Sequence, residues 1–73
     1  MKTAVKFDTT PWTRSHTAAP RGFGSWAFQV DGSDEVVFTR AMTFTDARKW
    51  MTARVRDDSA FRNLAVVFVN VLP

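Results

Sequence analysis

The chain has 73 residues, 45% of them hydrophobic, and a formal net charge of +3. A chain of this length forms a single domain with a thin core, because it buries only about 60% of the surface of its unfolded state. It has no cysteine and only one histidine, which excludes disulfide staples and Cys/His zinc clusters. Stability must therefore come from packing, for which seven Phe and three Trp are available.

The apolar stretches are too short for a membrane segment. The longest run covers residues 64–69, whereas a membrane-spanning helix needs about 20 apolar residues. Residues 1–8 alternate and carry charge, so they do not form the apolar region of a signal peptide. We therefore expect no membrane partner, a cytoplasmic location and a monomer, and the absence of cysteine fits a reducing compartment.

Residues 3–7 alternate in hydrophobicity and predict a short strand, with Val5 and Phe7 on one face. Residues 9–24 follow with two prolines, two glycines and no acidic residue, and they predict a long irregular loop. Structureless loops longer than about 12–15 residues are uncommon in compact domains. The loop at 9–24 is therefore expected either to be disordered or to contact a partner.

Residues 25–31 and 35–44 predict a β-hairpin, because both segments alternate and the Asp-Gly-Ser-Asp sequence between them is a turn signal. On the first strand Trp26, Phe28 and Val30 share a face. A continuous second strand places four further apolar side chains on one face: Val36, Phe38, Met42 and Phe44.

Residues 46–56 predict an amphipathic helix that begins after an N-cap at Thr43 or Thr45. Helical periodicity places Ala47, Met51 and Val55 on the inner side. The opposite side carries no acidic residue and consists of Arg48, Lys49, Thr52 and Arg56.

Asp57 and Asp58 predict the end of the helix, because acidic side chains oppose its negative C-terminal pole, and they are placed to cap a turn at residues 59–62. Residues 63–72 predict a last strand that is apolar on both faces and therefore central in the sheet.

The expected fold is α+β: a small antiparallel or mixed sheet in the order β-long loop-β-β-α-β, with one helix packed on one face and a single domain over residues 1–73. The aromatic side chains that follow strand or helix periodicity are expected in the core. They are Trp26, Phe28, Phe38, Phe44, Trp50, Phe61 and Phe68.

Catalytic and metal-binding patterns are weak. Ser15 and His16 are adjacent in a predicted loop, whereas a catalytic serine needs a base within hydrogen-bond reach and a third group that orients the base. Residues 31–35 cluster oxygen ligands without the spacing of a calcium loop, and no phosphate-binding glycine pattern is present. The sequence therefore predicts a protein that is not an enzyme and that holds neither a metal nor a cofactor.

The predicted function is partner binding. Trp12, in the loop, either pins the loop onto the domain or is an exposed anchor of an interface. The positive charges of the loop and of the outer helix face favour an acidic partner, and arginine with aromatics favours a protein over nucleic acid. A module that binds single-stranded nucleic acid is the alternative. The predicted partner-binding residues are Trp12, Arg14, His16, Arg21, Arg48, Lys49 and Arg56.

The chain as a whole resembles small phage-encoded host-takeover proteins. The resemblance lies in its length, its lone hairpin, the helix start TFTDAR at residues 43–48, and the segment DDSAFRNL at residues 57–64 that leads into an apolar strand. It implies a non-enzymatic regulator in the host cytoplasm that docks on bacterial RNA polymerase, inhibits transcription initiation and promotes antitermination. Phage inhibitors of other host complexes, such as CRISPR effectors, are similar in size and style and remain an alternative.

Overall fold

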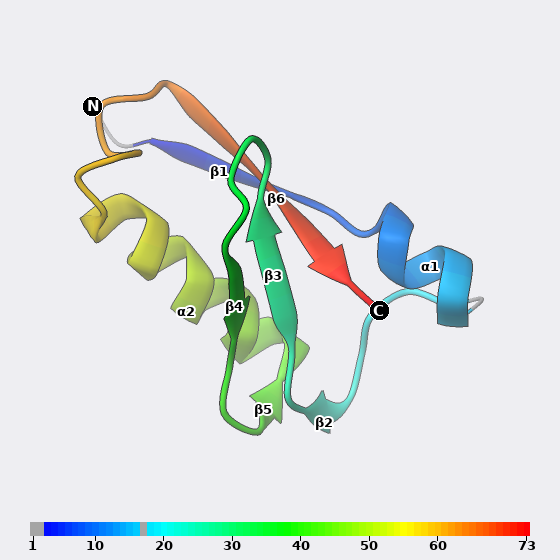
Figure 1. Cartoon of the computed structure of the whole chain (residues 1–73). Coiled ribbons are helices and arrows are strands. Elements are labelled where there is room, and N and C mark those ends of the chain that lie inside the picture. The colour runs from blue at the N-terminus through cyan, green and yellow to red at the C-terminus, as the bar shows by residue number, and fades with distance from the viewer. Residues whose placement is uncertain (1–2, 17) are drawn as a thin grey trace.

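A computed structural model describes residues 3–16 and 18–73, and its fold is α+β, as predicted (Figure 1). The elements follow in the order β1 (Ala4–Asp8), α1 (Thr10–His16), β2 (Phe23–Gly24), β3 (Ala27–Val30), β4 (Val36–Phe38), β5 (Met42–Thr43), α2 (Phe44–Asp57) and β6 (Val66–Leu72).

The main sheet is mixed and has four strands in the order β1-β6-β3-β4. β1 pairs parallel to β6, whereas β3 pairs antiparallel to both β6 and β4. The last strand is therefore internal to the sheet, as its apolar composition predicted. β2 and β5 form a separate two-residue ladder next to the start of α2.

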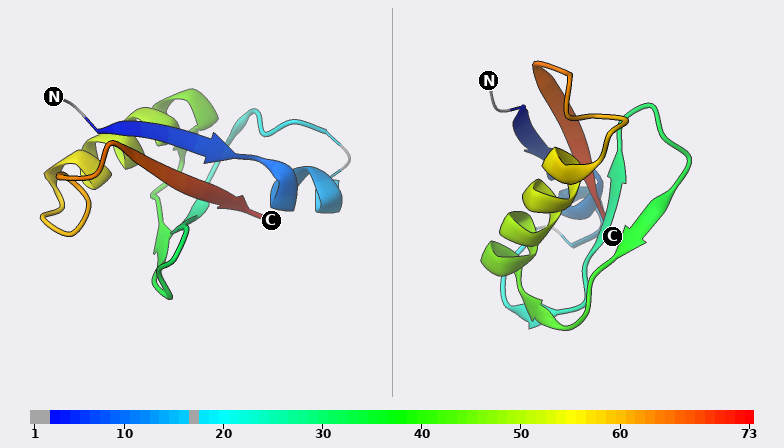
Figure 2. Two further views of the ribbon diagram at one scale, coloured as in Figure 1. Left: turned by 90° about the horizontal axis from the view of Figure 1, so that it is seen from above. Right: turned by 90° about the vertical axis from the view of Figure 1, so that its left-hand side faces the viewer.

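The core lies between the main sheet and α2, which covers one face of it (Figure 2). The predicted inner side of the helix is confirmed, since Ala47, Met51 and Val55 are its buried residues. Burial removes apolar surface from water, which is the main source of stability in a domain without disulfides. The main sheet, the residue before β3 and the β5 strand contribute the other buried hydrophobic side chains: Trp26, Phe28, Val30, Met42, Val67, Val69 and Val71.

The ends of α2 follow the predicted chemistry. Thr43 is the N-cap, and its hydroxyl accepts a hydrogen bond from the backbone N–H of Asp46 at 3.2 Å. Asp58 follows the last turn, and its carboxylate accepts from the N–H of Ala60 at 2.8 Å, which confirms the predicted capped turn. β6 begins at Val66, later than predicted, because this turn continues to residue 63.

The hairpin is confirmed, but the facing of its second strand was predicted wrongly. Val37 lies directly opposite Phe28 and shares its inward face, so Val36 and Phe38 point outward. The strand ends after Phe38, because the buried Thr39 accepts a hydrogen bond from the backbone N–H of Trp26 at 3.0 Å and donates to a carbonyl in the following turn at 2.8 Å. Because the strand is interrupted after Phe38, odd-numbered residues face inward before the break and the even-numbered Met42 is buried after it.

Three of the aromatic side chains expected in the core are exposed instead. Phe38 is 71% exposed and Phe68 49% exposed on the sheet face opposite α2, which we call the open face. Trp50 is 36% exposed on α2. The open face lacks a covering layer in the part of the chain that the structure describes, so alternation alone could not decide which aromatics are buried.

Candidate partner-binding surface

Residues 9–24 are not one irregular loop, because they contain helix α1 and strand β2. Pro11 lies in the first turn of α1, where a helix needs no N–H donor. The Asp8 carboxylate accepts from the Thr10 N–H at 2.9 Å, and the Thr13 hydroxyl donates to the Thr9 carbonyl at 2.9 Å. The sequence Asp-Thr-Thr-Pro at residues 8–11 is a helix-start signal that the loop prediction missed, because no apolar periodicity follows it.

Trp12 fixes α1 to the domain. Its ring centroid lies 4.8 Å from that of Trp26, which lies in turn 4.9 Å from that of Phe44 at the start of α2. On its other side Trp12 stacks on His16 with 3.7 Å between the centroids and 5° between the planes. Of the two alternatives for Trp12, the structure supports the pinning role, because the side chain is partly buried against the core.

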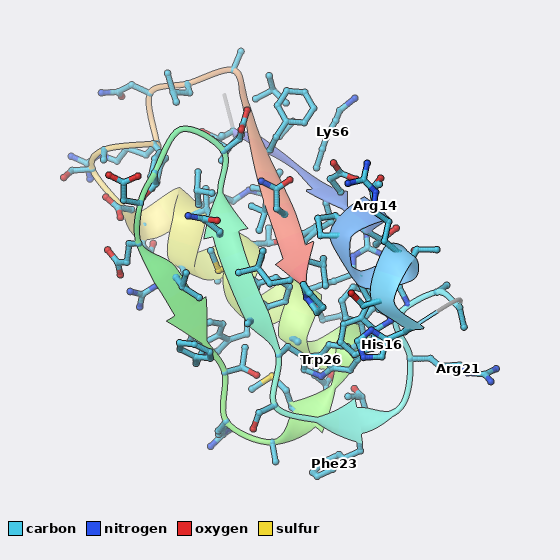
Figure 3. The ribbon with its side chains drawn as sticks, turned by 45° about the vertical axis from the view of Figure 1, so that its right-hand side comes forward. Lys6, Arg14, His16, Arg21, Phe23 and Trp26 are labelled. Atoms are coloured by element: carbon cyan, nitrogen blue, oxygen red, sulfur yellow. The ribbon has the colours of Figure 1, made fainter. Side chains whose placement is uncertain are left out.

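α1 and the segment after it present two arginines and two rings to solvent. Arg14 and Arg21 are exposed, and Figure 3 shows both pointing away from the ribbon. Phe23, on β2, is 74% exposed. We call the group of Arg14, His16, Arg21 and Phe23 the α1 surface. Arginine and exposed aromatic side chains are the residue types enriched in protein interfaces.

The backbone beside Arg21 is held in place by the start of α2. Gly22 has φ of 88°, a conformation that favours glycine, and its carbonyl accepts from the Phe44 N–H at 3.2 Å. The same Phe44 contacts Trp26. The connection from α1 to β2 is therefore held at both ends: at its start by the contact of Trp12 with Trp26, and at its end by the hydrogen bond to Phe44.

The pKa of Asp8 is held below its ordinary value by hydrogen bonds from the hydroxyl and the N–H of Thr10 and, to a smaller extent, by the charge of Arg14. Asp8 is fully exposed, so its main role is to orient the first turn of α1. Its negative charge offsets part of the positive charge at the base of the α1 surface.

The basic residues predicted on the long helix lie against β1 and the residue before it. Arg48 lies over the ring of Phe7 on β1, with 5.3 Å from its guanidinium carbon to the ring centroid. Together with Lys49 it lines a groove of about 260 Å³ between β1 and α2. Arg56 is structural, because its Nε donates to the carbonyl of Thr3 at 3.0 Å.

The open face adds candidate residues that sequence reasoning assigned to the core or left out. Lys6 lies directly opposite Phe68 in the β1–β6 ladder, and both side chains are exposed. Phe38 occupies the far strand of the same face. The alternation of charged and apolar residues in β1 was a usable signal for Lys6, whereas Phe68 gave none, since β6 is apolar on both faces.

Sites for other chemistry are poorly developed in the described residues. A hollow of about 230 Å³ between the hairpin and the end of α2 is smaller than the roughly 300–1,000 Å³ of usual ligand pockets, and two hollows of about 500 and 470 Å³ beside Trp50 are shallow and open to solvent. Residues 3–16 and 18–73 hold no group of three His, Cys, Asp or Glu side chains placed for a metal ion. Neither described helix has the length and hydrophobicity needed to cross a membrane.

Comparisons with known proteins found no match: no family model fits the sequence, and neither a curated protein nor a solved structure shows significant similarity to the chain.

Proposed function

We propose that the protein acts by binding another protein through the α1 surface, without catalysis. The observation that carries this proposal is the contrast between the exposure of α1 and its attachment. No side chain of α1 is fully buried, yet the partly buried Trp12 holds the helix in a defined position. An exposed element that is ordered before binding loses little conformational entropy on association, which favours affinity.

The charge of the α1 surface favours an acidic target. Arg14 and Arg21 provide two guanidinium groups suited to bidentate contacts with carboxylates, and Phe23 provides an exposed apolar contact two residues after Arg21. Following the resemblance to phage host-takeover proteins, the partner that we propose is bacterial RNA polymerase. Binding in the host cytoplasm then inhibits initiation at promoters and promotes antitermination.

The test is co-elution with purified bacterial RNA polymerase holoenzyme in size-exclusion chromatography at micromolar concentration, followed by promoter-dependent transcription in vitro. The double variant Arg14→Ala, Arg21→Ala is expected to lose binding by tenfold or more, since arginine is enriched among hot-spot residues, whose truncation costs roughly 2 kcal/mol or more. The control Arg54→Ala, Arg62→Ala removes the same charge away from α1 and should bind like the unchanged protein.

Absence of co-elution would contradict polymerase as the partner. A pull-down from bacterial lysate with the unchanged protein and the Arg14, Arg21 double variant then identifies the partner. A CRISPR effector or another host complex that is captured only by the unchanged protein would keep the α1 surface and replace the target. Equal capture by both baits would contradict the surface itself.

A single-stranded nucleic acid is the second candidate partner, and the open face favours it. Phe68 offers a stacking platform, and Lys6 lies directly opposite it for a phosphate contact. Titration with a short oligonucleotide at two salt concentrations is expected to show affinity that falls steeply with salt and drops in Phe68→Ala. Binding that is unchanged in Phe68→Ala would remove the open face from consideration.

A further inference from the structure

β1 is an edge strand with free hydrogen-bonding capacity along one side. It stands at the end of the sheet order, and no other described strand pairs with its outer edge. The N–H of Ala4 donates to Ala65 at 2.9 Å, at the start of the ladder with β6. Because alternate residues of a parallel strand pair to the same side, the backbone groups of Val5 and Phe7 point away from β6.

The contact of Arg56 with Thr3 supports the conclusion that this set of backbone groups points away from β6. Thr3 precedes Ala4 and belongs to the same alternating set as Val5 and Phe7. Its carbonyl accepts from Arg56 of α2 at 3.0 Å, so a side chain of α2 already occupies the first position along this edge. The next positions, Val5 and Phe7, face the groove between β1 and α2.

The groove has the composition of a site for an extended acidic segment. Its apolar part is formed by Val5 and Phe7, and Arg48 and Lys49 are exposed on α2 beside them. Two threonines, Thr45 and Thr52, complete the lining, so no acidic residue is present in it. An exposed sheet edge is normally blocked, and among the residues that the structure describes only the Thr3 position of this edge is occupied, by Arg56.

We propose that the groove takes an extended acidic segment of a partner protein, which adds to the sheet as a strand next to β1. The backbone N–H and C=O groups of Val5 and Phe7 pair with the segment, as in other cases of β-strand addition. Carboxylates on alternate residues of the segment meet Arg48 and Lys49. This inference rests on the proposed function, because it assumes a protein partner, and it names a second contact and the chemistry of that contact.

The test uses a synthetic peptide of about ten residues that alternates Val or Thr with Glu or Asp, because strands commonly span 3–10 residues. The peptide is titrated into the full-length ¹⁵N-labelled protein. We expect the amide signals of Val5 and Phe7 to shift and their hydrogen exchange to slow by tenfold or more. A peptide with Gln and Asn in place of the acids is the matched control and should bind at least tenfold more weakly.

Two changes separate the charges from the backbone. Arg48→Glu, Lys49→Glu should weaken peptide binding by tenfold or more, whereas Arg62→Glu, which changes charge outside the groove, should leave it within about twofold. A peptide that is N-methylated at alternate residues loses the strand-pairing donors on one edge without changing the protein. The methyl groups can be placed on the odd or on the even residues of the peptide, and only the set whose N–H groups face β1 should abolish binding.

Peptide binding that is indifferent to methylation in both phases, or that shifts residues outside β1 and α2, would overturn the inference. So would a dimer in sedimentation analysis whose Val5 and Phe7 amides are already protected, because a second copy would then occupy the edge. Neither of these two results would affect the proposed function, provided that capture of the polymerase still requires Arg14 and Arg21. If the α1 surface captures no protein but the acidic peptide still binds, the proposed function is contradicted and the inference about the groove stands.

Discussion

The two helices of this protein are built in opposite ways. α2 has 14 residues, a threonine cap and three buried side chains that complete the core. α1 has 7 residues, none of them fully buried, and only Trp12 among them packs partly buried against the core. Isolated helices shorter than about 12–15 residues are marginal in water, so α1 depends on Trp12 and on the Asp8 hydrogen bond at its start.

The difference between the two helices indicates that α2 contributes mainly to stability, whereas the exposed side of α1 is available for binding. Changes to the inner side of α2 act on the whole domain, because the core is thin and each buried side chain is a large part of it. Changes to the exposed side chains of α1 are expected to act locally, because those side chains lie outside the core. The exposed residues of α1 are therefore available to contact a partner without a cost to the core, which is the role proposed for the α1 surface.

The largest effect is expected for Met51→Ala. Met51 is 1% exposed, and truncation of a buried methionine costs about 2–5 kcal/mol. This approaches the total stability of a small domain, so denaturant unfolding should shift strongly. Met51→Leu conserves volume and should cost less than about 1.5 kcal/mol. A Met51→Ala loss as small as that of Met51→Leu would contradict the central position given to α2.

Trp12→Ala is expected to release α1 while the rest of the domain stays folded. The loss of global stability should be about 1–3 kcal/mol, below the ~3–5 kcal/mol of a fully buried tryptophan. Hydrogen exchange should accelerate in the amides of α1 and stay slow in those of α2. Trp12→Phe keeps an aromatic contact with Trp26 and is the control. Equal acceleration in both helices would break the comparison.

Thr43→Ala should lower the free energy of unfolding by about 1 kcal/mol, because the N–H of Asp46 loses its acceptor. Thr43→Ser keeps a capping hydroxyl and should retain most of the stability. Thermal unfolding of the three proteins measures the difference. Equal stability of the Ala and Ser variants would show that the cap contributes nothing to α2.

The smallest effect concerns the start of α1. The pKa of Asp8 is lowered on folding, so its contribution is complete at neutral pH and is lost as the pH falls through the lowered value. Carboxyl ¹³C titration should place its midpoint below the ordinary value of about 3.9. Thr10→Ala should move the midpoint upward, whereas Thr13→Ala, whose hydroxyl bonds to Thr9, should not. A midpoint unaffected by Thr10→Ala would rule out this arrangement.

Local signals predicted α2 and the internal position of the last strand. The spacing of Ala47, Met51 and Val55 and the cap at Thr43 each depend on residues within a few positions of one another. The facing of β4 could not be predicted in the same way, because it depends on where the strand ends. That end is set by the contact of Thr39 with Trp26, 13 residues away.

The predicted partner-binding set shows the same limit. Its residue types were read from the sequence, but their grouping was not. Arg14, His16 and Arg21 lie on the α1 surface, Arg48 and Lys49 line the groove beside β1, Trp12 turns inward and Arg56 holds the Thr3 carbonyl. The sequence left open whether the basic helix residues lie beside the loop, and the structure places Arg48 and Lys49 at the groove beside β1.

Composition and short-range pattern by themselves determined that this protein is a small α+β domain with an amphipathic helix, a hairpin and a final strand inside the sheet. These features depend on hydrophobic period, caps and turns, all of which are local. Only the tertiary structure decided that residues 9–24 contain a pinned helix, that Phe38 and Phe68 stay exposed, and that β1 leaves an edge beside basic side chains. Apart from the helix-start signal at residues 8–11, those outcomes depend on contacts between residues distant in the chain.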